Sequence, residues 1–487
     1  MKGEIVRRAS ATILVTLTMV AVFLSGCAGE TITKDVVLDA GKKFQTIDGF
    51  GVNITPAQWR EGNLKPVLDM LVDDLGCTLF RFDCYGTADW LDPNKRDKDG
   101  KYAQAYLEEV YTGKIFKDAW ATFRYLNSKG IEPYFNVSGR IPRGLAGPDG
   151  QTLKDFDGYA EMAVSMLKWA REKEKLKFSL FAPFNETDLG FPEGPRMQPD
   201  IVVPATKAIL KKLDEAGLGD IKLVVLCDAF PKLEKIAPIV RDDSMVGRIA
   251  YFSTHTYGDG GDQEPWKWFL EETDFAKFAK RVKQSPYKDC PVWLSEFGDL
   301  DQTAEVEFGI GWRCVRRLLK AIDDGFASGQ YWDAFDNFHE HDGAWATYGL
   351  FKVDRDKWTY TPKRRYFALK QIFRFVKPGF VRVSIEPELL ETNDVYKMWH
   401  APLKHIPLYA FISPDGNDFT IVGMSTVESD VQLNIKLKGV NIKGKTVACY
   451  RTSRNEDCKK VADAAAKGDA VTAIIPEECI FTLTTLK

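Results

Sequence analysis

Apolar and polar positions follow two alternating patterns along most of this chain. Between residues 46 and 377, short apolar runs rich in β-branched and aromatic residues alternate with stretches whose apolar residues recur at helical spacing. The first pattern is typical of buried strands and the second of helices that pack by one face. The predicted strands are Thr46–Ile54, Thr78–Cys84, Glu132–Val137, Phe178–Phe184, Lys222–Asp228, Ile249–Thr254, Val292–Ser295 and Gly329–Ala334.

Helical periodicity fills the intervals between these strands. The predicted helices are Leu64–Leu75, Phe116–Ser128, Tyr159–Glu174, Pro204–Ala216, Leu233–Arg241, Asp274–Gln284, Ala304–Asp324 and Lys363–Phe375. Strands that alternate with helices indicate a parallel sheet. Eight such units favour a closed (β/α)8 TIM barrel of the α/β class over residues 46–377.

The pattern changes after Pro378. Residues 378–487 alternate apolar and polar positions, as in Val431–Ile435, which predicts a C-terminal antiparallel β-sandwich. Residues 28–45 are also strand-like, and we expect this N-terminal segment to join the sandwich. The second domain would then be built from both ends of the chain.

The first 27 residues have the features of a targeting segment. Basic residues precede the uncharged run Ala11–Leu24, which is shorter than the ~20 residues of a spanning helix and suits a signal peptide. The run ends in Leu24-Ser25-Gly26-Cys27, which resembles the lipobox of bacterial lipoproteins. This resemblance implies lipid attachment at Cys27 and a place in the bacterial cell envelope, facing the periplasm or the exterior. The alternative is a plain secretory signal with a chance cysteine.

Composition narrows the class of partner. A length of 487 residues suits a barrel plus a second module, and 45% hydrophobic and 28% charged residues are ordinary for a globular protein. A net charge of −3 argues against nucleic acid as a partner. No spacing of cysteines or histidines indicates a zinc site, so we expect neither a metal nor a cofactor. Cys449 and Cys458 are near enough in sequence to pair in an oxidising compartment.

Two acidic residues stand where chemistry is expected in a barrel. The fourth predicted strand leads into Asn185 and Glu186, and the seventh leads into Glu296. Working residues of TIM barrels project from the carboxyl ends of strands. Carboxyl groups about 5–5.5 Å apart suit a retaining glycosidase, in which one carboxylate attacks the sugar and the other transfers protons. Taken singly, each glutamate could instead be a structural ion pair.

The Asn185-Glu186 pair on strand four and Glu296 on strand seven resemble clan A glycoside hydrolases. This resemblance implies that Glu186 is the acid/base, that Glu296 is the nucleophile and that Asn185 binds the sugar 2-hydroxyl. The opening Phe44-Gln45-Thr46-Ile47-Asp48-Gly49-Phe50-Gly51 looks like the first strand of glycoside hydrolase family 30, which also couples its barrel to a side β-sandwich. Families 39 and 5 of the same clan are rival assignments.

Four further residues are candidates for substrate binding on the barrel strands. Arg81 ends an apolar run on strand two, where its cation could hold Glu296 ionised. The clan resemblance implies that His255 and Tyr257 line the −1 subsite, with Tyr257 bonded to the nucleophile, and that Trp332 forms the floor under the sugar. The alternatives are a structural salt bridge, a packed aromatic pair and a core tryptophan.

Loop residues add weaker candidates. Aromatic residues that could stack on sugars or simply pack are Tyr85, Trp90, Phe191, Trp266, Trp268, Trp345 and Tyr348. Arg140 follows strand three, where the family 30 pattern is richer in Trp and Pro, and it could meet an acidic or hydroxylated substrate. We interpret His339–Asp342 as a substrate-facing or surface loop, and Gly258–Asp262 as a turn rather than a calcium site.

The sequence therefore predicts a retaining glycoside hydrolase that acts on β-linked oligo- or polysaccharides and meets the membrane only through an N-terminal lipid anchor. Two alternatives belong to other classes. A surface lipoprotein on the same scaffold could bind glycans without cleaving them. A barrel hydrolase could use a metal, although no ligand cluster is evident in the sequence.

Overall fold

The computed structural model describes residues 31–55, 58–83, 90–257, 272–302, 307–339, 343–387, 389–390, 405–427 and 429–486. The expected leader with Cys27 lies outside these ranges, as do Tyr85, Trp266, Trp268 and the 258–262 and 340–342 segments. Within the described ranges, no helix combines the length and the apolar character needed to cross a membrane.

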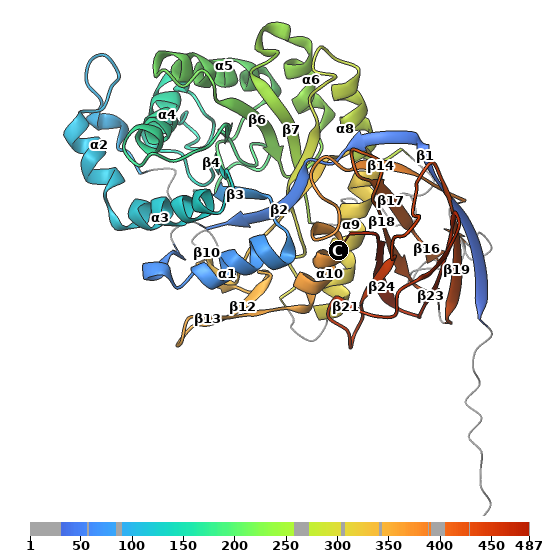
Figure 1. Ribbon diagram of the computed structural model, residues 1–487. Helices are drawn as coiled ribbons and strands as arrows, with labels where there is room; N and C mark the ends of the chain where they lie inside the picture. Colours follow the sequence, from blue (N-terminus) through green and yellow to red (C-terminus); the bar gives the residue numbers. More distant parts are fainter. Residues whose placement is uncertain are drawn as a thin grey trace, which may run out of the picture.

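The first domain is a closed barrel of eight parallel strands (Figure 1). Its strands are β2 (Gly49–Ile54), β3 (Leu79–Asp83), β4 (Tyr134–Asn136), β5 (Leu180–Ala182), β6 (Lys222–Asp228), β7 (Ile249–Thr256), β8 (Val292–Phe297) and β9 (Ser328–Tyr331). Each of them overlaps one predicted strand, and β2 closes the barrel by pairing with both β3 and β9. The predicted TIM barrel is confirmed.

Helices connect the strands around the outside of the barrel. They are α1 (Lys65–Asp69), α2 (Gln104–Tyr111), α3 (Lys114–Ser128), α4 (Phe156–Glu172), α5 (Pro199–Glu215), α6 (Leu233–Arg241), α8 (Asp274–Lys283), α9 (Glu307–Asp323) and α10 (Arg364–Phe373). A π-helical segment, Met70–Leu75, continues α1. Two hairpins follow β9, formed by β10 (Asn337–His339) with β11 (Ala344–Ala346) and by β12 (Phe351–Asp354) with β13 (Thr359–Pro362). Helix α2 and these hairpins were not predicted.

The barrel interior is apolar at one end and polar at the other. Trp293 and Tyr134 lie in an apolar cluster inside the barrel, and Trp293 stacks on Tyr251 with ring centroids 3.5 Å apart. Nearer the carboxyl ends of the strands, Arg81 and Asn53 are fully buried polar residues. Burying such groups is costly unless they are bonded or do chemical work, so this end of the barrel is where a site is expected.

The second domain is one sheet of ten strands that carries its own hydrophobic core. In sheet order the strands are β21 (Lys459–Lys460), β20 (Ala448–Thr452), β24 (Cys479–Thr484), β18 (Phe419–Ser425), β17 (Leu408–Ile412), β14 (Val381–Glu386), β1 (Ile32–Thr46), β19 (Val431–Lys438), β23 (Ala470–Ile475) and β22 (Ala465–Lys467). A short separate pair is formed by β15 (Leu389–Leu390) and β16 (His405–Ile406).

The strands of this domain form one continuous sheet rather than two separate antiparallel layers. Strand β1 pairs antiparallel with β14 and parallel with β19, so it joins the two halves of the sheet. Residues of both halves, such as Ile421 of β18 and Leu433 of β19, belong to one buried cluster. The sheet therefore folds over onto itself, and the N-terminal strand lies in its middle rather than at an edge.

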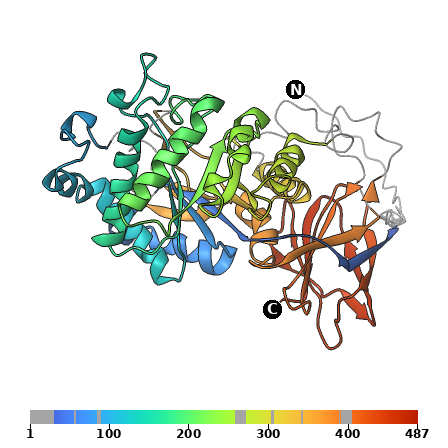
Figure 2. The same cartoon turned by 90° about the horizontal axis from the view of Figure 1, so that it is seen from above.

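Helix α10 packs the second domain against the barrel. Gln371 is fully buried there; its side chain donates to Thr452 Oγ1 at 2.9 Å and accepts from Thr482 Oγ1 at 2.7 Å. Val422 and Ile480 of the sheet belong to the barrel's hydrophobic cluster. Figure 2 shows the two domains side by side, with the dark-blue strand β1 in the second domain.

The cysteines of the described residues are all free. Cys449 and Cys458, which are close enough in sequence to pair, lie buried on and beside β20 without a disulfide. Both behave as small apolar residues, because burial raises the pKa of each thiol.

Candidate active site

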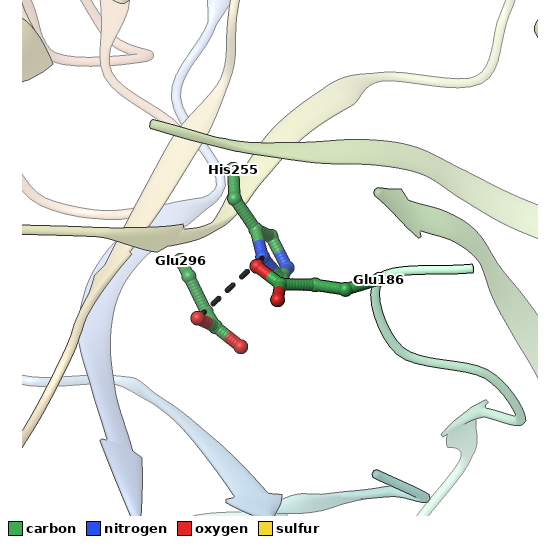
Figure 3. Close-up of side chains that lie close together, drawn as sticks. All are labelled: Glu186, His255 and Glu296. Atoms are coloured by element: carbon green, nitrogen blue, oxygen red, sulfur yellow. Dashed lines mark hydrogen bonds and ion pairs between the residues drawn. The ribbon is translucent and has the colours of Figure 1, made fainter. Parts of the chain in front are cut away.

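Three acidic and basic side chains meet at the carboxyl ends of the barrel strands. Glu186 follows β5, His255 lies in β7 and Glu296 lies in β8. Figure 3 shows the three side chains pointing toward one another. One carboxylate oxygen from each glutamate and one ring nitrogen of the histidine all lie within 4.8 Å of each other. The structure thus brings together two carboxyl groups that are far apart in sequence.

Glu296 is held by one cation and one hydroxyl group. Arg81 Nη1 forms an ion pair with Glu296 Oε1, and the Tyr257 hydroxyl donates to Glu296 Oε2. Arg81 has no exposed surface, and Glu296 is only 5% exposed. A buried carboxylate needs such partners to remain charged. These contacts stabilise the anionic form of Glu296 and fix its orientation.

Arg81 is itself fixed by two asparagines. Its Nη1 donates to Asn53 Oδ1 at 2.7 Å, and its Nη2 donates to Asn185 Oδ1 at 2.6 Å. Asn185 also donates from Nδ2 to the Glu193 carbonyl at 3.2 Å. Asn53, the last residue but one of β2, was missed by the sequence analysis. Its place at the end of a buried barrel strand was the available signal.

Glu186 lies in surroundings that favour its protonated form. The residue is 7% exposed. Burial raises the pKa of Glu186 well above its usual value, and the nearby negative charge of Glu296 raises it further. Glu186 therefore has the surroundings of a proton donor, and raising the pKa of one carboxyl group is how proteins give separate acid and base roles to like side chains.

His255 connects the two carboxyl groups. Its Nδ1 lies 2.8 Å from Glu186 Oε1 and 3.5 Å from Glu296 Oε2. Burial lowers the pKa of His255 to about 4, so the ring is neutral near pH 7. A neutral imidazole can form one hydrogen bond with Glu186, and it adds no second cation beside Arg81.

Aromatic residues form a wall beside Glu296. Trp332, which follows β9, belongs to a buried cluster with Tyr348 and Ala346, and Tyr257 packs against that cluster. The Trp332 ring lies 5.4 Å from the His339 ring. Because Tyr257 also donates to Glu296, the structure places Trp332 on the same side of the site as the expected nucleophile.

Other loop candidates have no described contact with the two carboxyl groups. Trp90 packs on the outer helices, with its ring 6.0 Å from Phe116 and its Nε1 donating to the Tyr111 hydroxyl at 3.2 Å. The described contacts of Trp90 are therefore those of a packing residue. Phe191 is 47% exposed, and the Arg140 guanidinium lies 4.7 Å above its ring.

A second group of buried acids lies at the same end of the barrel. Asp83 ends β3 and accepts hydrogen bonds from Ser138 Oγ and from Asn136 Nδ2, the latter at 3.0 Å. Asp333 follows Trp332 after β9 and is 1% exposed. Burial raises the pKa of both carboxyl groups. Sequence reasoning missed them, although each follows a buried strand.

The Glu186, His255 and Glu296 atoms are also close enough to hold a metal ion. The oxygens of Glu296 already accept from Arg81 and Tyr257, and one oxygen of Glu186 already contacts His255. Arg81 thus already supplies a positive charge beside Glu296. This donor set fits a pair of working carboxyl groups better than a metal centre.

The sequence matches no protein-family model and no curated protein. The structure aligns with a glycoside hydrolase family 30 subfamily 8 xylanase from Clostridium acetobutylicum at 15% identity and a TM-score of 0.68, over 92% of this chain and 99% of that chain. A conserved exported protein from Bacteroides fragilis aligns at 13% identity and a TM-score of 0.69, over 93% and 100%. A glycoside hydrolase family 39 β-xylosidase from Caulobacter crescentus aligns at 14% identity and a TM-score of 0.58, over 93% and 100%. The fold is therefore one that this chain shares with family 30 and family 39 glycoside hydrolases.

Proposed function

We propose that this protein is a retaining glycoside hydrolase that cleaves β-linked glycans, with Glu296 as the nucleophile and Glu186 as the acid/base. One observation carries the proposal: the two carboxyl groups approach within 4.8 Å at the mouth of the barrel, where burial favours the protonated form of Glu186 and the Arg81 guanidinium pairs with Glu296. This separation suits direct attack on the sugar and leaves no room for the intervening water of an inverting enzyme.

The first step forms a glycosyl–enzyme ester. A Glu296 oxygen attacks the anomeric carbon while the bond to the leaving oxygen breaks, and Glu186 gives its proton to that oxygen. Arg81 and Tyr257 keep Glu296 charged and aimed before the attack. The buried environment of Glu186 keeps its proton bound above the usual pKa of 4.5.

The second step uses the same two residues in reverse. Glu186, now a carboxylate, takes a proton from water, and the water oxygen attacks the anomeric carbon. The ester bond to Glu296 breaks and Glu186 ends protonated, ready for another cycle. Two inversions at one carbon leave the product with the configuration of the substrate.

Similar folds in xylanases and a β-xylosidase support a carbohydrate substrate. The wall formed by Trp332, Tyr348 and Tyr257 provides an apolar surface of the kind on which a sugar ring can stack. We expect the substrate to be a β-linked oligo- or polysaccharide.

Product stereochemistry tests the proposal. The purified protein would be screened on aryl β-glycosides and on plant and fungal polysaccharides, and the first-formed anomer would be read by proton NMR. We expect the β anomer to appear first and to equilibrate later. Initial release of the α anomer would overturn the retaining mechanism, and saturable binding without turnover would favour the glycan-binding alternative.

We also propose that the protein is attached to the cell envelope through lipid on Cys27. The support is the sequence Leu24-Ser25-Gly26-Cys27 after an apolar run. Cys27→Ala should move the protein from the membrane fraction to the soluble fraction of lysed cells. Unchanged membrane retention of this variant would refute the anchor.

A further inference from the structure

The loop that carries Glu186 is bonded to the end of β6 by three consecutive residues. Each of residues 186, 187 and 188 contacts its counterpart at 227, 228 and 229, and we name these contacts the 186–188 clamp. The pairs are Glu186 N to Cys227 O at 2.9 Å, Thr187 Oγ1 to Asp228 Oδ1 at 2.7 Å, and Ala229 N to Asp188 Oδ1 at 3.0 Å. Such a regular set of contacts holds one loop rigidly against another.

A buried lysine of α6 supports the centre of the clamp. Lys235 is 5% exposed, and its Nζ donates to Thr187 Oγ1 at 2.8 Å and to the Met197 carbonyl. The Thr187 hydroxyl therefore accepts from Lys235 and donates to Asp228, which fixes the direction of both bonds. At the edge of the clamp, Lys232 Nζ lies 3.4 Å from Asp188 Oδ2.

The backbone on both sides of the clamp is strained. Glu186 has a φ of 39°, and Leu226 and Cys227 have φ values of 77° and 51°. Residues with side chains rarely adopt this left-handed region, and they keep it only where surrounding contacts enforce it. The pairing of β6 with β7 also shifts register between Leu226 and Asp228. The strained residues coincide with the clamp.

From this geometry we infer that Thr187, Asp228 and Lys235 are positioning residues that hold Glu186 in its left-handed conformation and so aim its carboxyl group at the leaving oxygen. The inference rests on the proposed function. Without the clamp, Glu186 can relax to an ordinary backbone conformation, which would carry its carboxyl group away from His255 Nδ1, now 2.8 Å distant. Proton donation would fail while Glu296 and its partners stay in place.

Leaving-group dependence separates positioning from general structural damage. A 2,4-dinitrophenyl glycoside departs without a proton, whereas the phenyl or methyl glycoside of the same sugar needs one. In Thr187→Val we expect kcat/KM for the poor leaving group to fall roughly tenfold or more, with little change for the dinitrophenyl glycoside. Thr187→Ser, which restores the hydroxyl, should recover most of the loss.

The matched control is Thr206→Val. Thr206 is 1% exposed, and its hydroxyl donates to the Val202 carbonyl at 2.7 Å within α5, away from the clamp. Thr206→Val should not lower kcat/KM for the poor leaving group more than kcat/KM for the dinitrophenyl glycoside. Equal losses on both glycosides in Thr187→Val, or no loss on either, would overturn the inference. Lys235→Met gives a second variant for the same comparison.

A titration of Glu186 tests the clamp independently of turnover. With 13C-labelled glutamate carboxyls, the Glu186 signal is assigned by its absence in Glu186→Gln. Because burial is the largest cause of the raised pKa of Glu186, releasing the loop should lower that pKa toward its usual 4.5 in Thr187→Val but not in Thr206→Val. An unmoved titration would refute the clamp, whereas a wild-type protein inactive on every glycoside would refute the proposed function instead.

Discussion

Glu186 and Glu296 are identical side chains whose surroundings give them different chemistry. Glu296 faces a fully buried guanidinium and a tyrosine hydroxyl, which stabilise its charge. Glu186 faces a neutral imidazole and the charge of Glu296, and burial favours its protonated form. Division of labour between two carboxyl groups follows from such contrasts.

At the residue scale, the pH dependence of kcat/KM should report Glu186. The raised pKa of Glu186 places its deprotonation above its usual value of 4.5. Because the first step needs the proton, activity should fall as pH rises through that pKa. Glu186→Gln should lower kcat/KM for unactivated glycosides by about 100-fold or more and remove this limb. The control is Glu172→Gln, on an exposed position of α4. It should leave kcat/KM and its fall at high pH unchanged. Persistence of the limb in Glu186→Gln would contradict the assignment.

His255 should make folding stability depend on pH. The pKa of His255 is lowered from 6.5 to about 4 in the folded protein. Between these two pH values the unfolded chain binds a proton on His255 that the folded protein does not bind. Stability should therefore fall as pH drops from 6.5 toward 4, by up to about 3 kcal/mol at ~1.4 kcal/mol per pKa unit. Urea unfolding at pH 7 and at pH 4.5 measures this loss. The free energy of unfolding should fall less between the two pH values in His255→Asn than in the wild-type protein. Equal slopes for both proteins would count against this contribution.

Single residues at strand ends could be predicted, whereas contacts between loops could not. Arg81 and Glu296 each follow an apolar run, and closing the barrel brings such strand ends together. Thr187 stands out in no local pattern. Asp228 ends a predicted strand, but its contact with Thr187 depends on how two loops meet after the barrel has closed. Trp90 was named from its residue type alone, and it packs on outer helices.

At the element scale, α9 and α10 are joined by an ion pair between buried Arg365 and partly buried Glu307. Arg365 is 1% exposed; its Nε donates to Glu307 Oε1 at 2.6 Å and its Nη2 to Glu307 Oε2 at 2.9 Å. Its Nη1 donates to the Tyr348 carbonyl at 2.8 Å, which connects these helices to the aromatic wall of the site.

Removing the charge of Glu307 should destabilise the fold. Glu307→Gln leaves the Arg365 cation buried without its counter-charge, and we expect a loss of about 3 kcal/mol in the free energy of unfolding by urea. The control is Glu478→Gln, whose partner Arg454 is 68% exposed, and which should cost less than about 0.5 kcal/mol. Equal effects of the two substitutions would show that the buried pair adds nothing.

Element prediction succeeded where periodicity was strong. All eight barrel strands were predicted, and α6 was predicted at its observed bounds, Leu233–Arg241. Helix α2 was missed because only Tyr111 among its residues is fully buried, so it lacks a clear apolar stripe. The register shift at the end of β6 depends on pairing with β7 and has no signal in one strand alone.

At the scale of the whole molecule, the two ends of the chain build one domain. Strand β1 is the first described element of the chain, yet it lies between β14 and β19 (Figure 1). Its Val36 and Leu38 are 2% and 0% exposed in the core of that domain. The sequence predicted that this segment would be a strand, but alternation cannot show which strands it pairs with, so its central place and its parallel pairing with β19 were not foreseen.

Deleting residues 31–46 should unfold the second domain. The deletion leaves β14 and β19 without their shared neighbour and exposes two new sheet edges. We expect a lower melting temperature by differential scanning fluorimetry and rapid proteolysis after residue 380, whereas a chain that begins at residue 31 should resist. An unchanged melting curve for the deletion would show that β1 is dispensable.

Trapping of the glycosyl–enzyme tests the central claim most directly. The protein would be incubated with 2,4-dinitrophenyl 2-deoxy-2-fluoro-β-glycosides of glucose, xylose and galactose, and its peptides analysed by mass spectrometry. We expect one added fluoroglycosyl group on the peptide that contains Glu296, and none on Glu296→Gln. Labelling of another residue would contradict the assignment of Glu296 as the nucleophile. So would continuous hydrolysis of the unsubstituted glycoside if its fluoro analogue left no trapped ester.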